Sequence, residues 1–277
     1  MTHRNGLITR RNALHDRNAS LSGGPCTIAN PIENILDINP QIAAESTGSS
    51  LSFTGSWGAE YPIGLIAFAG LRTSSNGTMR VTAGSYDSGT VTTWPETGFA
   101  GVIDPETGNW TLNGVYPEDV VIALGYTRVF IPTTPVRASS FSVEINDVGT
   151  VVSVGVAGAY TVWEPPVNFD YKWTMSPIDS SEKVRVQRGA TFIDKRPIFR
   201  RLSLGFPYLP EDDFWLGGFD AVVSKGQSEP LWVVPYSDPT EVNKWEKAAV
   251  YGLISRESEL SNPLFGEYAL PIQIDQL

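Results

Sequence analysis

The stretch Ile63-Gly-Leu-Ile-Ala-Phe-Ala-Gly-Leu71 is apolar along its whole length, and Met79-Arg-Val-Thr-Ala83 follows it after the turn-forming residues 72–77. An uninterrupted apolar run of this length suits a strand covered on both faces, whereas period-two alternation suits a strand with one wet face. Glycine, serine and asparagine between the two stretches favour a turn. The pair therefore predicts neighbouring strands in a layered β domain.

Similar strand-like stretches continue on both sides of this pair, without a helical pattern between them. They lie at residues 51–55, 90–94, 120–124, 127–131, 140–145 and 151–156. Residues 25–39 hold several isoleucines, and Pro25, Pro31 and the following Pro40 exclude a long helix there and favour an extended segment. Short strands at this spacing predict a β-sandwich of jelly-roll type.

A domain boundary is expected near residues 163–170. No lysine precedes Lys172, and the change in composition falls just after the Pro165-Pro166 pair, which favours extended backbone. We therefore expect an all-β chain in three parts. These are a basic N-terminal arm at 1–24, a jelly-roll-like β-sandwich at 25–165, and a β-rich C-terminal domain with one or two short helices at 166–277.

The C-terminal part holds both strand and helix signals. Residues 184–192 and 202–204 alternate as strands do. Pro210 followed by Glu211, Asp212 and Asp213 suits the start of a short helix, because acids favour a helix N-terminus. Residues 239–250, with Trp245, Ala248 and Ala249 on one helical face, predict a second one.

Composition argues against several classes of function. The net charge is −10, and although residues 1–20 carry a net +3, acids are spread over the rest of the chain, so nucleic acid is a poor partner. No run approaches the ~20 apolar residues of a membrane span. Cys26 is the single cysteine, and His3 and His15 are the only histidines. We therefore expect no disulfide within the chain, no metal, no cofactor and no enzymatic activity.

Three short motifs invite chemical hypotheses, and each has a simpler interpretation. Glu211, Asp212 and Asp213 would suit a glycan hydrolase with paired carboxylates, but a helix-capping turn is favoured. Residues 104–110 offer oxygen ligands for calcium, yet a tight turn between strands explains them. Ser88 lies in a turn-like Tyr-Asp-Ser-Gly sequence, and no nearby histidine would activate it.

Aromatic rings and the basic arm are the stronger candidates for contact with a partner. Several rings lie in or beside predicted loops, where a sugar-binding sandwich presents them, although each ring alone is more often core or interface. The candidate interface or glycan-contacting residues are Arg4, Arg10, Arg11, Trp57, Tyr61, Trp94, Trp110 and Tyr116.

Both halves of the chain resemble structural proteins of tailed bacteriophages. The Met79-Arg-Val-Thr-Ala83 strand, the Tyr86-Asp-Ser-Gly89 turn and the strand ending at Trp94 resemble a jelly-roll domain similar to galactose-binding-like sandwiches. The order of segments 206–216, 219–223, 226–236, 250–254 and 268–274 resembles the C-terminal half of virion proteins encoded among tail-tip genes. No catalytic residue accompanies these motifs.

This resemblance implies a structural protein of the virion, at the distal tail or baseplate, that is assembled in the host cytoplasm. Its implied partners are other tail or baseplate proteins and further copies of itself in a ring. The alternative is a carbohydrate-binding module that attaches the particle to host-surface glycans, because such a sandwich hosts more than one function.

Overall fold

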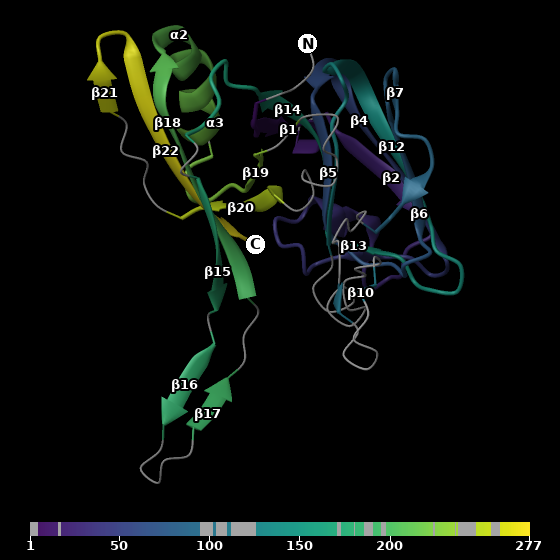
Figure 1. Ribbon diagram of the computed structural model, residues 1–277. Coiled ribbons are helices and arrows are strands. Elements are labelled where there is room, and N and C mark those ends of the chain that lie inside the picture. The colour runs from purple at the N-terminus through teal and green to yellow at the C-terminus, as the bar shows by residue number, and fades with distance from the viewer. Residues whose placement is uncertain are drawn as a thin grey trace. The chain divides into compact units, whose positions relative to one another are not determined.

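The computed structural model describes residues 5–15, 18–94, 102–103, 110–111, 126–170, 173–179, 181–185, 191–194, 198–223, 225–235, 237, 248–255 and 261–277 (Figure 1). The chain divides into two compact units. Unit 1 comprises Met1–Glu164 and Val234–Ala249, and unit 2 comprises Pro165–Val233 and Val250–Leu277. The division at Glu164 and Pro165 lies beside the double proline, and a segment from the second half of the chain belongs to unit 1.

Unit 1 contains two antiparallel sheets, with strand orders β11-β5-β14-β1 and β2-β4-β12-β6-β7, and β8 pairs with β6. The first sheet has β1 (Leu7–Asn12), β5 (Leu65–Leu71), β11 (Tyr126–Phe130) and β14 (Val156–Trp163). The second has β2 (Ser20–Gly24), β4 (Ser50–Ile63), β6 (Thr78–Ala83), β7 (Tyr86–Asp87), β8 (Val91–Thr92) and β12 (Val136–Asn146). Smaller elements are β3 (Ala44–Glu45) paired with β13 (Ser153–Val154), β9 (Val102–Ile103) paired with β10 (Trp110–Thr111), and the 3-10 helices η1 (Ala13–His15) and η2 (Ile32–Leu36).

One hydrophobic core joins the two sheets of unit 1. All seven residues of β5 are buried, as the apolar run predicts, whereas β6 buries every second residue. Phe68 from the first sheet and Phe53 and Phe141 from the second belong to the same core. The predicted all-β sandwich is therefore confirmed.

The expectation of a separate basic arm is corrected by strand β1. Leu7 and Ile8 are buried, and β1 pairs with β14 in the first sheet of unit 1. Residues 20–24 form β2, which pairs with β4. Most of the described part of this segment is therefore built into the sandwich, because its few apolar residues find partners that lie far away in the sequence.

Unit 2 has the strand order β19-β20-β22-β18-β15, and β21 also pairs with β22. The strands are β15 (Thr174–Asp179), β18 (Ile198–Pro210), β19 (Leu231–Val234), β20 (Val250–Ile254), β21 (Ser261–Leu264) and β22 (Glu267–Gln276), with the hairpin of β16 (Glu182–Arg185) and β17 (Thr191–Asp194). The chain after β18 is helical through α2 (Glu211–Asp213), the π-type turn η3 (Phe214–Phe219) and α3 (Asp220–Val223).

This arrangement confirms a β-rich C-terminal part with a short helix after Pro210. Residues 238–247, which hold most of the second expected helix, lie outside the described residues, and β20 begins at Val250. The helical segment lies at the same end of the long β18–β22 pair as the β21 hairpin (Figure 1). That end of unit 2 therefore brings two separate parts of the sequence together.

Candidate functional site

Two of the predicted contact rings are buried in unit 1. Trp57 is 3% exposed and its indole N–H donates to the Ala138 carbonyl at 3.0 Å. Trp94 is 7% exposed and donates to the Thr73 carbonyl at 3.0 Å. The expectation of exposed rings is wrong for both, because the two indoles fill the core and satisfy backbone carbonyls there.

The other candidates on unit 1 are only partly placed. Arg10 and Arg11 lie in β1, and the Arg11 guanidinium lies 5.1 Å from the centre of the Tyr61 ring, which is half-buried. Trp110 lies in β10, but its side chain, like Arg4 and Tyr116, is outside the described residues. Arg11 and Tyr61 are therefore the candidate pair that the structure brings together.

The motifs with chemical hypotheses have structural roles where the structure describes them. The Ser88 hydroxyl accepts from the Val81 N–H at 2.9 Å and donates to the Gly89 carbonyl at 2.7 Å, which fixes a turn. The acids 211–213 form α2 at the start of the helical segment. Residues 104–109 lie outside the described residues. In the described part of the chain, no three His, Cys, Asp or Glu side chains gather as metal ligands, and no helix is long and apolar enough to cross a membrane.

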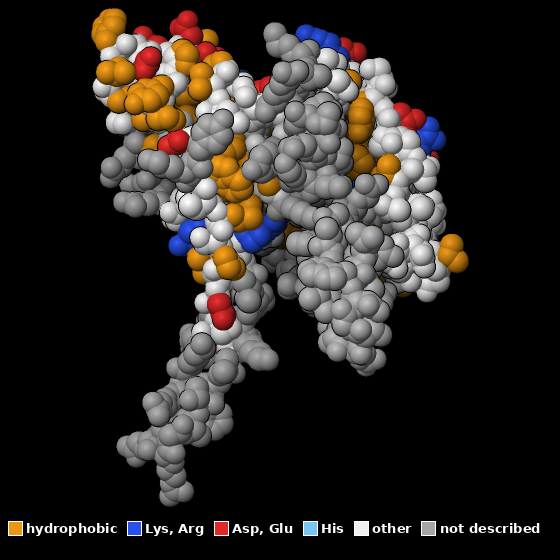
Figure 2. Space-filling view, in the orientation of Figure 1, with side chains coloured by type: hydrophobic (Ala, Val, Ile, Leu, Met, Phe, Trp, Pro, Cys, Tyr) orange, Lys and Arg blue, Asp and Glu red, His pale blue; other side chains and the backbone are white. Residues whose placement is uncertain are grey.

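A surface that we call the aromatic patch lies at the end of unit 2 that holds β21 and α2. It consists of Trp215 and Leu216 on η3, which are 44% and 71% exposed, and Leu264 and Phe265 at the hairpin, which are 56% and 105% exposed. Hydrophobic side chains gather at this end with acidic side chains among them (Figure 2). An exposed surface with so many large apolar side chains is typical of an interaction site.

The base of the aromatic patch is formed by packed rings and a hydrogen-bonded turn. The buried Phe214 ring stacks on Tyr268 of β22 with centroids 4.4 Å apart, and Trp215 meets the same Tyr268 edge-on at 5.6 Å. The Glu211 N–H donates to the Gly266 carbonyl at 3.1 Å, which ties α2 to the hairpin turn. Gly266 has φ +77°, a conformation that favours glycine in such a turn. The exposed Trp215 ring is therefore held by contacts with the rings behind it, and the hairpin turn that carries Phe265 is tied to α2.

Acidic side chains border the aromatic patch. Glu211 and Asp212 in α2 and Asp220 in α3 are exposed, and Glu267 at the start of β22 is half-buried. The hydroxyl of Tyr268 donates to Glu211 at 3.4 Å. The border therefore gives this apolar surface a negative field.

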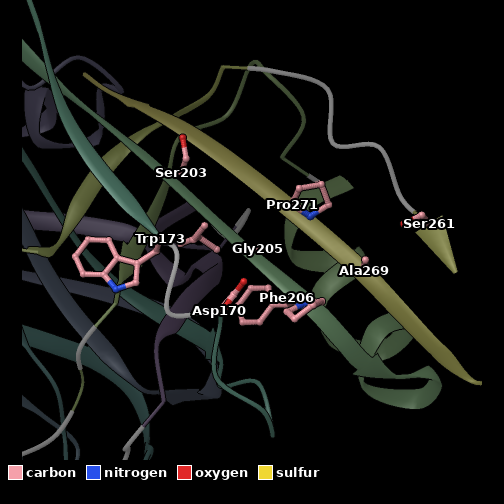
Figure 3. Close-up of a pocket in the computed structure, with 10 residues that line it drawn as sticks. Asp170, Trp173, Ser203, Gly205, Phe206, Ser261, Ala269 and Pro271 are labelled. Atoms are coloured by element: carbon pink, nitrogen blue, oxygen red, sulfur yellow. The ribbon is translucent and has the colours of Figure 1, made fainter. Parts of the chain in front are cut away.

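A second feature, which we call the trough, crosses β18 and β22 and has a volume of about 360 Å³ (Figure 3). Asp170 and Trp173 lie on one side of it, and Ser261 of β21 lies on the other. The Trp173 N–H donates to the Asp170 carbonyl at 3.2 Å, and the Asp170 N–H donates to the Gly205 carbonyl at 2.9 Å. The first of these backbone bonds ties Trp173 to Asp170, and the second ties Asp170 to β18.

Small residues make the floor of the trough. Residues 203–207 of β18 all line the trough; among them Leu204 and Phe206 are buried, whereas the alternate positions Ser203 and Gly205 are half-buried. Ala269 and Pro271 are the lining residues of β22. A Cβ atom at Gly205 would meet only the Pro271 Cα, at 3.9 Å. Short side chains therefore form the more exposed part of the trough's floor, while Leu204 and Phe206 are buried beside them.

Sequence reasoning missed both surfaces on unit 2. It predicted a short helix that starts at the acids 211–213 and did not single out Trp215 or Leu216 as exposed, and Asp170 and Trp173 were not singled out either. One available signal was Leu264-Phe265 directly before Gly266, since large apolar residues in a tight turn have little core to enter. No local sequence pattern indicates the trough, because its shape depends on how β18 is aligned with β22.

Comparisons with known proteins leave the family open. No protein-family model matches the chain, and a search of curated proteins gives no significant match. Similar solved structures include a GH29 fucosidase of Ruminococcus gnavus in complex with fucose, with 15% identity and a TM-score of 0.36 over 55% of this chain and 26% of the fucosidase.

Two smaller domains give similar values. A family 32 carbohydrate-binding module of Clostridium perfringens in complex with galactose has 16% identity and a TM-score of 0.35, over 54% of this chain and 98% of the module. The lectin-binding domain of lectinolysin complexed with Lewis b has 11% identity and a TM-score of 0.34, over 55% and 97%. At TM-scores this low the similarity does not define a shared fold, and the all-β class rests on this chain's own strands and pairings.

Proposed function

We propose that this chain is a non-enzymatic structural subunit that works by burying the aromatic patch against another protein of a larger assembly. The supporting observation is the patch itself, because Trp215, Leu216, Leu264 and Phe265 lie open to solvent at the end of unit 2 where Phe214 stacks on Tyr268. Aromatic side chains at such positions commonly supply much of the binding free energy once a partner excludes water. A stable contact would bury about 1,000 Å² or more in total, so the patch would be its centre.

The acidic border limits the choice of partner surface. Two copies that met patch to patch would bring Glu211, Asp212 and Asp220 of each copy toward the same acids of the other, which is unfavourable. A surface with an apolar centre and basic side chains around it fits better. In a ring of identical subunits, the patch would therefore meet a different surface of the next copy, as in a heterologous contact.

The assembly that we propose is the distal tail or baseplate of a tailed bacteriophage. This proposal is supported by the sequence resemblance of both halves to virion proteins, and it gives the aromatic patch a partner among tail proteins. The alternative is a carbohydrate-binding module that presents aromatic rings on the sandwich. Two of its candidate rings, Trp57 and Trp94, are buried and so cannot contact a glycan. A saccharide site on unit 2 is a separate question.

Light scattering after size exclusion tests the assembly role. The full chain is measured alone over a range of concentrations and mixed with proteins encoded by the genes beside its own. We expect a discrete oligomer or a joint complex, which the double variant Leu216→Ser, Phe265→Ser loses. Val148→Ser is the matched control, because Val148 is also an exposed apolar residue but lies on unit 1. A monomer in every mixture, or a complex that the double variant forms equally well, would overturn the proposal.

A further inference from the structure

We propose that the trough of unit 2 is a binding site for a neutral saccharide. The trough is separate from the aromatic patch, so this inference does not depend on the assembly role. Its volume of about 360 Å³ lies in the range of small-molecule sites, which is ~300–1,000 Å³. Its lining combines one indole, a carboxylate, two serine hydroxyls, small and proline side chains, and the buried Leu204 and Phe206.

The indole of Trp173 supplies the apolar face that a sugar ring needs. Phe169 meets Trp173 edge-on, with centroids 6.1 Å apart and ring planes at 90°, and Phe169 in turn packs edge-on against Phe206 at 6.2 Å. These contacts fix the orientation of a half-buried ring at the side of the trough (Figure 3). A preformed aromatic surface binds at low cost in conformational entropy.

Asp170 supplies the polar side of the site. Among the residues that the structure describes, its carboxylate oxygens have no hydrogen-bond or ion-pair partner, although its backbone is fixed to Gly205. A half-buried carboxylate of this kind accepts hydrogen bonds from sugar hydroxyls, and Ser203 and Ser261 offer hydroxyls that donate or accept. The negative charge disfavours uronic and sialic acids, so we infer a neutral ligand.

A proline-rich peptide is the competing occupant, since such peptides also bind aromatic-lined grooves. That mode uses several exposed rings to hold an extended helix of three residues per turn. The trough has only one partly exposed ring among its described lining residues, because Phe206 is buried. Its floor of serine, glycine and alanine suits hydroxyl groups better, so the observations favour the saccharide.

Ligand-observed NMR on the full chain tests the inference with galactose, glucose, N-acetylglucosamine and lactose as probes. Galacturonic acid serves as the charged control and a decaproline peptide as the competing occupant. We expect saturable binding of at least one neutral sugar, and weaker or no binding of galacturonic acid. No binding by any neutral sugar at millimolar concentration, or binding of decaproline alone, would overturn the proposal.

Three variants test whether the ligand binds in the trough. Gly205→Val fills the floor without a clash at Cβ, and Trp173→Ala removes the indole; each should weaken sugar binding roughly tenfold or more, or about 1.4 kcal/mol. Asp170→Asn should weaken it as well and reduce the discrimination against galacturonic acid. Trp215→Ala is the matched control, because it removes an indole of the aromatic patch and leaves the trough intact.

Folding of each variant is followed by circular dichroism during heating. If Trp173→Ala unfolds, Gly205→Val and Asp170→Asn still decide the result. Sugar binding that is unchanged in both of these variants would show that the ligand lies elsewhere. Failure of this test leaves the light-scattering test of the aromatic patch unaffected.

Discussion

Two tryptophans of unit 1 differ in burial from a tryptophan and a phenylalanine of unit 2. In unit 1, Trp57 and Trp94 are buried and each indole N–H is bonded to a carbonyl. In unit 2, Trp215 and Phe265 lie on the surface above a stacked base. The comparison teaches that the count of aromatic residues does not locate a binding surface. The informative rings are the ones that remain exposed after the core has formed.

The largest expected effect is on the core of unit 1. Phe141 is buried between Phe53 and Trp57, with ring centroids at 5.9 Å and 6.2 Å. Phe141→Ala should lower the free energy of unfolding by about 3–5 kcal/mol, because it leaves a cavity. Phe265→Ala, at the exposed hairpin, should change it by less than about 0.5 kcal/mol. Urea titration followed by tryptophan fluorescence measures both, and equal losses would remove the distinction between the two regions.

A smaller difference in stability is expected between substitutions of two aspartates, one buried in unit 1 and one at the edge of the trough in unit 2. Asp147 is buried and accepts hydrogen bonds from the Ser74 N–H at 2.6 Å and from its hydroxyl at 2.5 Å. Asp147→Ala should cost about 2 kcal/mol, since it leaves a donor without its partner. Asp170→Asn, at the edge of the trough, should leave stability within about 0.5 kcal/mol. Thermal unfolding of the two variants beside the parent chain compares them, and a costly Asp170→Asn would mean that Asp170 is structural.

A third comparison sets the stability cost of altering the buried indole of Trp94 against that of altering the exposed indole of Trp215. Trp94→Phe removes the donor to the Thr73 carbonyl and should cost about 1 kcal/mol. Trp215→Phe should have almost no effect on stability, because the ring is partly exposed. Chemical denaturation of both variants gives the two values. A larger loss from Trp215→Phe would show that the aromatic patch supports the fold of unit 2.

The smallest effect concerns pH. Asp87 receives hydrogen bonds from Arg80 and from the Gly89 N–H, which lower its pKa from 3.8 to about 2. The charged form is therefore favoured in the folded state, and its contribution to stability is present above pH 3.8 and lost as the pH falls to 2. Because the pair is exposed, the effect should be slight. Urea midpoints at several pH values should fall less in Asp87→Asn than in the parent chain, and parallel curves would contradict this.

Much of the fold was accessible from the sequence where local pattern and burial agree. Residues 65–71 of the apolar run form β5, and the alternation 79–83 lies in β6, both with the expected burial, although Ile63 belongs to β4. Strand β1 was missed because Arg10 and Arg11 dominate its charge, while its pairing with β14 joins residues far apart in the sequence. Long-range pairing of this kind leaves no local trace.

The candidate site was harder to predict, because exposure depends on tertiary packing. For Trp57 the signal was present, since Leu51, Phe53 and Trp57 lie two or four residues apart along β4 and are all buried on one face. For Trp215 it was absent, because nothing local tells which side of the helical segment the β22 strand covers. The trough likewise depends on Gly205 lying opposite Pro271 across β18 and β22.

The hairpin turn at Phe265 and Gly266 has a consequence for the specificity of the proposed contact. The pairing of β18 with β22 and the Phe214–Tyr268 stack hold this end of unit 2 without help from Leu264 or Phe265. Mutations at these two positions therefore cost little in folding. A few substitutions here can therefore change which surface the proposed contact would fit while the fold is kept, whereas substitutions in the packed core of unit 1 would destabilise it.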